Sequence, residues 1–408
     1  MPASAFRPPL GHRLWRQLPV RQRRRVATWV SALIAPAIDP VPPPACHGVA
    51  VAGEVSRASG LGEGARLIAR GIRQAGLPTW MIDIGNLLPA HTEDFAVTSE
   101  PPPQGAPLVL HVNAPQLPWV LFRLPRALVR GRRIIGYWLW ELPTVPPEWR
   151  AGARFVHEVW VPSEFVAAAV EPLLPGRVRV VPFPLAAARP EPSALRRDAF
   201  GLPAEAVVVL VSFNLASSLE RKNPLAAIAA FRAAFGDRSD RILLMKVGNR
   251  AHAPDDFARI VQAVRGAPNI RLETRTLPAA DLHALTAAAD IVLSLHRSEG
   301  FGLVLAEAML LRRPVIATGW SGNMAFMDAH SAALIDYRLV PARDPRQVYA
   351  GACWAEPDHE AAVAQLRRLA GDPAERAALG ARGEAAATLR LGIAPLCAAL
   401  RGIGLPVP

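Results

Sequence analysis

Short apolar runs alternate with helical patterns over the first half of the chain. The runs cover residues 47–52, 79–84, 108–112, 132–138, 157–161 and 177–181. Between them, as over 65–74, apolar positions recur with the helical period until Gly or Pro ends the pattern, and the polar, Pro-rich stretch 85–106 reads as a loop. Strands that alternate with helices in this way form βαβ units and a parallel sheet.

A segment rich in Pro and Ala, residues 182–204, carries no strand signal, and beyond it the alternation starts again. We therefore expect two Rossmann-like, doubly wound α/β domains facing each other across a cleft, with ligands at the carboxyl ends of their strands. The expected divisions are a basic N-terminal segment at 1–45, a first domain at 46–185, a linker at 186–204, a second domain at 205–372 and a helical tail at 373–408.

Charge adds a preference for anionic partners, since the net charge is +12 and all but two of the basic residues, Lys222 and Lys246, are arginine. The bias toward arginine makes each remaining lysine informative, because a solvated surface position would have become Arg. The three cysteines lie far apart, which is typical of a reducing compartment. No metal-ligand spacing is present in the sequence, so we expect no metal cofactor.

The basic residues are concentrated at the N-terminus, where residues 1–38 hold seven arginines and no acidic residue. Apolar residues then recur at helical spacing, at Val26, Trp29, Val30, Leu33 and Ile34, up to Pro36. A basic amphipathic helix of this kind could lie on an anionic membrane surface, pack on the protein with a solvated Arg face, or belong to a secretory signal. No apolar stretch reaches the length of a membrane span.

The segment 291–323 carries the densest chemistry. Polar residues follow an apolar run, and Gly300-Phe301-Gly302 opens a helix, where free amides and glycines suit a pyrophosphate. Glu299 precedes the helix, and Glu307 lies within it among apolar neighbours, where a carboxylate requires a hydrogen-bond donor such as a sugar hydroxyl. The alternative is that Glu299 caps the helix and Glu307 bonds a neighbouring N–H.

The run Glu299-Gly-Phe-Gly-Leu, followed by Glu307-Ala-Met and Pro314-Val-Ile-Ala, resembles the signature of retaining glycosyltransferase family 4, the Glu-x7-Glu type. The resemblance implies the GT-B fold and transfer of a sugar from a nucleotide diphosphate sugar bound by the second domain. It implies that Glu299 contacts donor-sugar hydroxyls and that Glu307 contacts the ribose. The amides of Gly300, Phe301 and Gly302 would face the diphosphate or the sugar.

A second motif at 212–224 runs from the strand end at Asn214 to Arg221-Lys222-Asn223-Pro224. Cations at the mouth of a cleft can hold a diphosphate and stabilise its leaving charge, so we expect Arg221 and Lys222 to do so and Asn214 to line the nucleotide site. Many family members place an Arg where this chain has Ser217, which leaves open whether Arg221 supplies the second cation.

The first domain carries weaker signals. Gly60 and Gly62 follow the first strand, where the family often has a glycine pair near the donor phosphates or the acceptor. Trp138, Trp140 and Glu141 follow another strand, and they suit either sugar recognition or core packing. His111 ends a strand near the point where the family places a His at the reaction centre, although a lone strand His is often structural.

The expected function is therefore retaining transfer to a glycan or lipid-linked acceptor in cell-surface polysaccharide synthesis. We expect a cytoplasmic protein without a nucleic-acid partner, and peripheral attachment to the inner face of the plasma membrane stays open. Two alternatives remain. Gly60-x-Gly62-x-x-Ala65 with Asp83 fits an NAD(P)-dependent oxidoreductase, and the basic residues fit a membrane-surface binder without catalysis.

Overall fold

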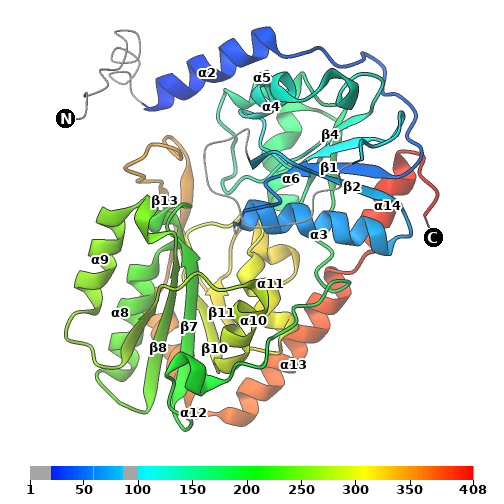
Figure 1. The fold of residues 1–408 in the computed structure, drawn as a ribbon. Helices are drawn as coiled ribbons and strands as arrows, with labels where there is room; N and C mark the ends of the chain where they lie inside the picture. The colour runs from blue at the N-terminus through cyan, green and yellow to red at the C-terminus, as the bar shows by residue number, and fades with distance from the viewer. Residues whose placement is uncertain (1–19, 58, 86–99, 408) are drawn as a thin grey trace, which may run out of the picture.

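The computed structural model describes residues 20–57, 59–85 and 100–407 and shows two α/β domains side by side (Figure 1). The expected fold class is confirmed, since each domain contains a parallel six-stranded sheet. The arginines at 7, 13 and 16 and most of the expected loop at 85–106 lie outside the described residues.

The first domain is built on a sheet of order β2-β1-β3-β4-β5-β6. Its central strands are buried on both faces, as their continuous apolar sequences require. The strands are β1 Val49–Gly53, β2 Thr79–Asp83, β3 Leu108–Leu110, β4 Ile134–Tyr137, β5 Glu158–Val161 and β6 Val178–Val180. The helices are α2 Val20–Ile34, α3 Gly60–Gln74, α4 Leu117–Arg123, α5 Trp149–Ala153 and α6 Glu164–Val170, with the 3-10 turns η2 Arg126–Leu128 and η3 Glu171–Leu173.

Helix α3 begins at Gly60, earlier than the pattern starting at Ala65 predicts. Ser59 caps the helix, because its hydroxyl accepts a hydrogen bond from the amide of Gly62 at 3.0 Å. The glycines lie inside the first turns because neighbouring chain passes close to them. A Cβ on Gly62 would lie 2.4 Å from the carbonyl oxygen of Arg57.

The second domain has the sheet order β12-β11-β10-β7-β8-β9, all pairs parallel. Its strands are β7 Val207–Asn214, β8 Arg241–Gly248, β9 Ile270–Glu273, β10 Ile291–Ser294, β11 Val315–Thr318 and β12 Ala333–Ile335. Its helices are α7 Leu219–Lys222, α8 Pro224–Phe235, α9 Pro254–Val264, α10 Ala279–Ala288, α11 Leu303–Leu310 and α12 His359–Gly371, with the 3-10 turns η4 Arg197–Phe200, η5 Arg250–His252 and η6 Gly322–Ala325. An antiparallel hairpin that the sequence did not predict, β13 Tyr337–Pro341 and β14 Cys353–Pro357, follows β12.

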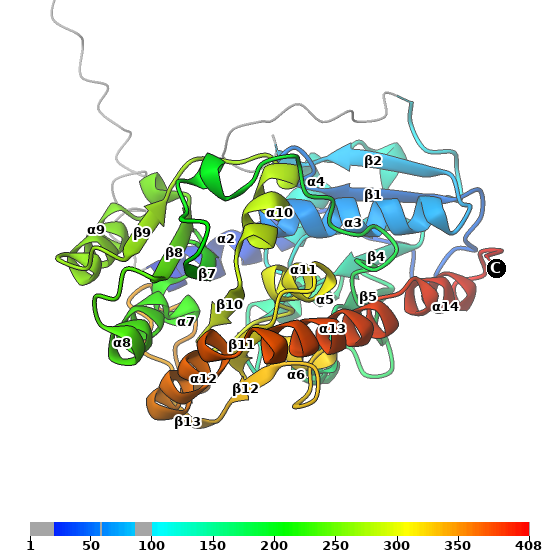
Figure 2. The same cartoon turned by 90° about the horizontal axis from the view of Figure 1, so that it is seen from below.

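The C-terminal helices α13 Pro373–Arg390 and α14 Ala394–Gly402 run across both domains and return the chain to the first (Figure 2). Helix α13 packs on α11 and α14 packs on α3. Among the described residues, the stretch Pro373–Gly402 is long and apolar enough to cross a membrane by length and composition, contrary to the sequence-based expectation. Its packing on both domains buries part of this apolar stretch.

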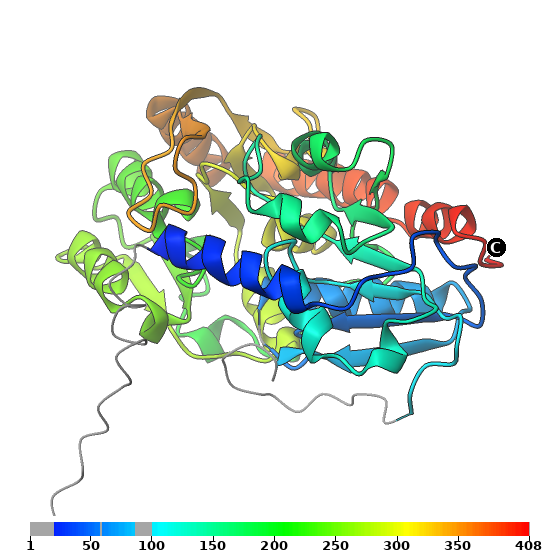
Figure 3. The same ribbon diagram turned by 90° about the horizontal axis from the view of Figure 1, so that it is seen from above.

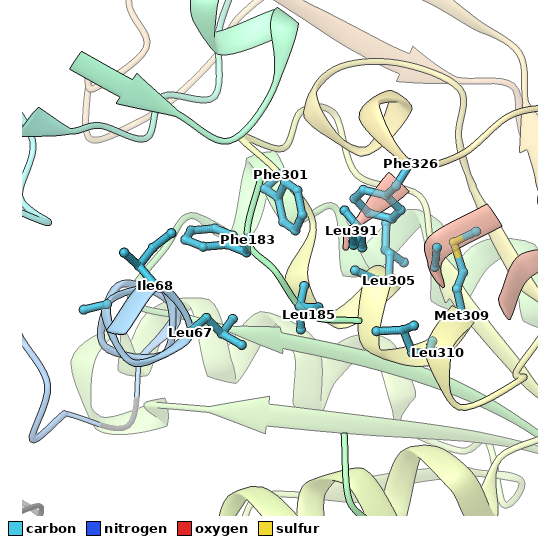
Figure 4. Close-up of a cluster of buried hydrophobic side chains, with 14 of the residues drawn as sticks. Leu67, Ile68, Phe183, Leu185, Phe301, Leu305, Met309, Leu310, Phe326 and Leu391 are labelled. Atoms are coloured by element: carbon cyan, nitrogen blue, oxygen red, sulfur yellow. The ribbon is translucent and has the colours of Figure 1, made fainter. Parts of the chain in front are cut away.

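The two domains share one hydrophobic core (Figure 4). Leu67 and Ile68 of α3 meet Phe183 and Leu185, at the end of the first domain, and these meet Phe301 just before α11. The Phe183 and Phe301 rings are 5.1 Å apart, edge to face. Apolar packing therefore fills the part of the expected cleft that lies between α3 and the start of α11.

Candidate active site

Glu299 lies at the centre of a buried charge cluster between β10 and α11. Its carboxylate accepts hydrogen bonds from both cations of the 212–224 motif, with Oε1 2.5 Å from Lys222 Nζ and Oε2 3.2 Å from Arg221 Nη1. Burial alone would raise the pKa of Glu299, but Lys222, Arg221 and His296 outweigh burial and hold that pKa at about 2. The two motifs therefore meet, and Glu299 is ionised at neutral pH.

Lys222 occupies the accessible edge of the cluster, with 20% of its side chain exposed. It ends α7, where Asn223 adopts the left-handed conformation at φ 52° and anchors the turn by donating from Nδ2 to the carbonyl oxygen of Leu295 at 3.0 Å. Burial lowers the pKa of Lys222, and the nearby Glu299 opposes that change. Lys222 is therefore a cation held at a fixed place with one side open.

Arg221 is 3% exposed, and all three guanidinium nitrogens have protein partners. Nε donates to the Tyr349 hydroxyl at 3.1 Å, and Nη1 donates to the carbonyl oxygen of Ser298 at 2.7 Å. Nη2 lies 3.5 Å from Oε1 of Glu141, which follows β4 of the first domain. Burial would lower the pKa of Arg221, but its anionic and hydroxyl partners raise it. Arg221 therefore links the second domain to Glu141 of the first domain.

The residues Gly300, Phe301 and Gly302 form the tight entry to α11. The Gly300 carbonyl accepts a bond from Ser163 Oγ at 3.0 Å, and a Cβ on Gly300 would lie 2.9 Å from the carbonyl oxygen of Trp140. Gly302 has φ 96°, a conformation that glycine adopts readily. The Phe301 side chain is buried in the shared core, so only its backbone can face a ligand.

The N-termini of α11 and α3 face each other across the domain boundary. In the described part of the chain, the amides of Phe301, Gly302 and Leu303 form no hydrogen bond. A Cβ on Gly60 would meet only Leu303, at 3.9 Å. Free amides and the positive ends of two helix dipoles therefore lie close together, an arrangement suited to an anion such as a diphosphate.

Glu307 lies on α11 with its Oε1 3.9 Å from Nε2 of His283 on α10. Burial would lower the pKa of His283, but Glu307 raises it above the usual value. His283 also contacts the carbonyl oxygen of Glu191 in the linker at 3.3 Å. Glu307 thus interacts with His283 of the neighbouring helix, and a carboxylate can accept further hydrogen bonds from ligand hydroxyls.

His111 follows β3 and is 1% exposed, with its ring stacked on Tyr137 at 4.9 Å and tilted against Phe183 at 6.0 Å. Burial lowers its pKa to about 4, so the imidazole is neutral. Neither ring nitrogen has a hydrogen-bond partner in the described structure. Nε2 faces α3, because a Cβ on Gly64 would lie 2.6 Å from it. The Phe183 ring contacts both the His111 ring and the Phe301 ring.

Other predicted residues have local structural explanations. Asn214 accepts bonds from the amide of Ala216 at 2.8 Å and from Asn249 at 3.1 Å, which shapes the turn after β7. Trp138 and Trp140 are buried and pack edge to face on Trp149, so core packing describes them.

Two neighbours of the cluster escaped sequence reasoning. Tyr349 reaches it from the loop between β13 and β14, and it donates to Oε2 of Glu141 at 3.4 Å. His296 is fully buried beside Asn323, with Nε2 and Oδ1 3.1 Å apart. The rarity of tyrosine, three in the chain, was the one available signal for Tyr349. No group of three His, Cys, Asp or Glu side chains among the described residues could hold a metal ion.

Residues 206–355, which contain Glu299, Glu307, Lys222 and Arg221, match the family model Glycosyl transferases group 1. This part of the chain is therefore similar to glycosyltransferases of that group. A trehalose synthase of Rubrobacter xylanophilus is 27% identical over 250 residues, 56% of this chain and 57% of the relative. A D-inositol 3-phosphate glycosyltransferase of Kineococcus radiotolerans is 31% identical over 220 residues, 51% of this chain and 47% of the relative. The chain thus matches about half the length of these curated relatives.

Solved structures extend the likeness to both domains. A glycosyltransferase from Rickettsia africae matches with a TM-score of 0.60 and 13% identity over 88% of this chain and 98% of the other. Sucrose-phosphate synthase from Thermosynechococcus elongatus matches with 0.60 and 17% over 87% and 98%. Anabaena HepE in complex with UDP and glucose matches with 0.58 and 14% over the same shares, 87% and 98%. The chain has the two-domain GT-B fold of these glycosyltransferases.

Proposed function

We propose that the protein transfers a sugar from a nucleotide diphosphate sugar to a glycan or lipid-linked acceptor, with retention at the anomeric carbon. The observation that carries this proposal is the Lys222–Glu299 pair at 2.5 Å, placed beside the free amides that open α11. The match of residues 206–355 and the solved structure with UDP and glucose support it.

In this proposal the diphosphate lies between the N-termini of α11 and α3, with Lys222 at its side. Fixed donors and dipoles of this kind stabilise the charge that develops on a leaving phosphate. Lys222 would exchange part of its contact with Glu299 for the phosphate, and Glu299 would then accept hydrogen bonds from sugar hydroxyls. Glu307 would accept bonds from the ribose. Arg221 would hold Glu299 and the domains in place.

Retention would proceed by attack on the same face that the phosphate leaves. Glu299 is a weak nucleophile, because two cations hold its pKa at about 2. The acceptor oxygen would instead bond to the anomeric carbon as the bond to the phosphate breaks, with the phosphate oxygen taking the acceptor proton. His111, neutral and with no partner for either ring nitrogen in the described structure, would accept a hydrogen bond from a sugar hydroxyl.

The finer parts of the proposal are a role in cell-surface polysaccharide synthesis and a cytoplasmic location. The location is supported by Cys46, Cys353 and Cys397, which are free thiols. The oxidoreductase alternative does not explain the match of residues 206–355 to the glycosyltransferase family model. The alternative of a surface binder without catalysis meets the same objection.

The test begins with thermal melting in the presence of UDP-, GDP-, ADP- and dTDP-sugars. The sugar nucleotide that raises the melting temperature then serves as donor in transfer assays. Lys222→Ala and Glu299→Ala should each lower kcat by about 100-fold or more, because each removes a preorganised contact to the donor. Arg265→Ala, an exposed cation beyond α9, is the control and should keep wild-type turnover. Wild-type turnover by both site variants would refute the proposal, as would stabilisation by NAD(P)H alone.

A further inference from the structure

Helix α2 lies ahead of both Rossmann-like domains and outside the segment that matches the family model. It packs along α4 and α5 of the first domain. The packed side consists of small residues, with Thr28 and Ser31 buried and Ala32 and Ala35 against the core. Thr28 Oγ1 donates to the carbonyl oxygen of Pro115 at 3.3 Å. The helix is therefore attached through its small side, which directs its large apolar side away from the protein.

The outward side of α2 carries an apolar stripe of Val26, Trp29, Val30, Leu33 and Ile34. Trp29 is 63% exposed and Leu33 is 65% exposed. In the view from above, α2 lies in front of the domains with no helix or strand over it (Figure 3). Single exposed apolar residues are ordinary, but a contiguous group on one helix marks an interaction surface.

Helix α4 extends the same surface. Trp119 and Phe122 are 38% and 45% exposed, and their rings are 5.9 Å apart. The guanidinium of Arg123 lies 5.6 Å from the centre of the Trp119 ring. Aromatic rings beside arginines suit the boundary between head groups and acyl chains, where a ring can be half buried and a cation stays wet.

Exposed arginines surround the apolar residues. They are Arg25, Arg123, Arg126, Arg130, Arg150 and Arg154. Arg25 lies 3.7 Å from Glu148, and none of the other five has an acidic partner within 4 Å in the described part of the chain. The second domain behaves differently, because its arginines commonly pair with acids, as Arg259 does with Glu220 at 2.7 Å. This face of the first domain therefore has uncompensated positive charge.

A groove of about 730 Å³ lies beside the C-terminal end of α2, between residues 38–40 and α5. Its lining includes Arg150, Arg154 and Arg177. His157 at its base is neutral, since burial lowers its pKa, and its ring nitrogens contact the amide of Ile134 and the carbonyl oxygen of Asp39. The lining thus carries three arginines against one carboxylate, Asp39, which accepts a bond from the amide of Gly131, and this excess of positive charge suits phosphate head groups.

We propose that α2, α4 and α5 form a docking face for an anionic bilayer, with α2 lying in the plane of the interface. The apolar stripe enters the boundary with the acyl chains, and the arginines contact the phosphates. A nucleic acid would satisfy the arginines but leave Leu33 and Ile34 in water. A second copy of the chain would bring two basic faces together, which repel.

The test uses the full-length protein in sedimentation with vesicles of phosphatidylcholine alone or with phosphatidylglycerol added. Binding is expected to the anionic vesicles only and should weaken as salt is raised. The apolar variant Trp29→Ser/Leu33→Ser and the charge variant Arg126→Glu/Arg130→Glu should each lower binding about tenfold or more. Leu389→Ser is the matched control, because Leu389 is 82% exposed on α13, away from this face.

Thermal melting checks that each variant folds, which is expected because the substituted side chains are exposed. Equal binding to neutral vesicles, or equal binding by the α2 variant, would overturn the proposal. If the protein binds duplex DNA at the same salt concentration, and Trp29→Ser/Leu33→Ser does not change that binding, the arginines bind nucleic acid and the proposal is wrong. Self-association that the same variant abolishes would make the face a contact between copies. All of these readouts are independent of sugar transfer.

Discussion

Replacing Glu299 by Gln tests the buried charge cluster. The pKa of Glu299 lies at about 2, against 4.5 for a free Glu. One pH unit corresponds to about 1.4 kcal/mol, so the ionised carboxylate contributes about 3 kcal/mol to folding. Glu299→Gln should lower the free energy of unfolding at pH 7 by roughly that amount, since Lys222 and Arg221 lose their shared carboxylate.

The pH dependence gives the sharper signature. A carboxyl group whose pKa is depressed in the folded state contributes its full stability above about pH 4.5 and loses it as the pH falls toward 2. The difference between wild type and Glu299→Gln should therefore be constant from pH 7 to 5 and shrink by about two-thirds by pH 3. Urea unfolding followed by fluorescence and circular dichroism measures it, at pH values where the two transitions coincide.

An exposed carboxylate provides the control. Asp240 also has a pKa of about 2, lowered by hydrogen bonding to Arg238. It is solvent-exposed, so Asp240→Asn should leave the free energy of unfolding near the wild-type value. A difference for Glu299→Gln that is below about 1 kcal/mol, or that does not change with pH, would contradict the assigned burial and pairing.

Two further substitutions probe the first domain. Gly64→Ala should lower the melting temperature and the rate of transfer, because its Cβ would lie 2.6 Å from His111 Nε2 and 2.8 Å from the Phe183 ring. The control Gly371→Ala has open space around it and should melt at or above the wild-type temperature. Equal melting temperatures for the two variants would contradict this packing. The pKa of His111 is lowered to about 4, so the stability that its neutral ring contributes is complete above about pH 6.5 and is lost as the pH falls toward 4. The melting temperature of His111→Phe should therefore fall less than that of the wild type between pH 7 and 5. An equal fall for both proteins would contradict this assignment.

The sequence predicted the sheets well because buried parallel strands are continuous apolar runs. The helix predicted to open at Gly300-Phe301-Gly302 is α11, which begins at Leu303. The hairpin of β13 and β14 escaped prediction because Tyr337–Pro341 is short and mostly exposed, so it lacks the continuous apolar run of a buried strand. Helical spacing identified the apolar stripe of α2, but periodicity cannot tell whether a stripe faces the core or the solvent.

The candidate site was predictable only in its local parts. Glu299 and the glycines at the start of α11 are consecutive in sequence, and Lys222 belongs to a second short motif, so both could be recognised from the sequence. Arg221, by contrast, contacts Glu141, which lies 80 positions before it, and Tyr349, which lies 128 positions after it. Such contacts depend on how two finished domains meet, which no short pattern encodes.

The shared core has a consequence for where the molecule can be divided. The match to the family model covers residues 206–355, yet Tyr349 and Trp354 within it pack in the aromatic cluster of the first domain, and Phe301 packs on Phe183 of that domain. A fragment cut to the matched residues would expose these rings to water. The segment that matches the family model is therefore smaller than the unit that unfolds cooperatively. Limited proteolysis should not release the second domain as a stable fragment.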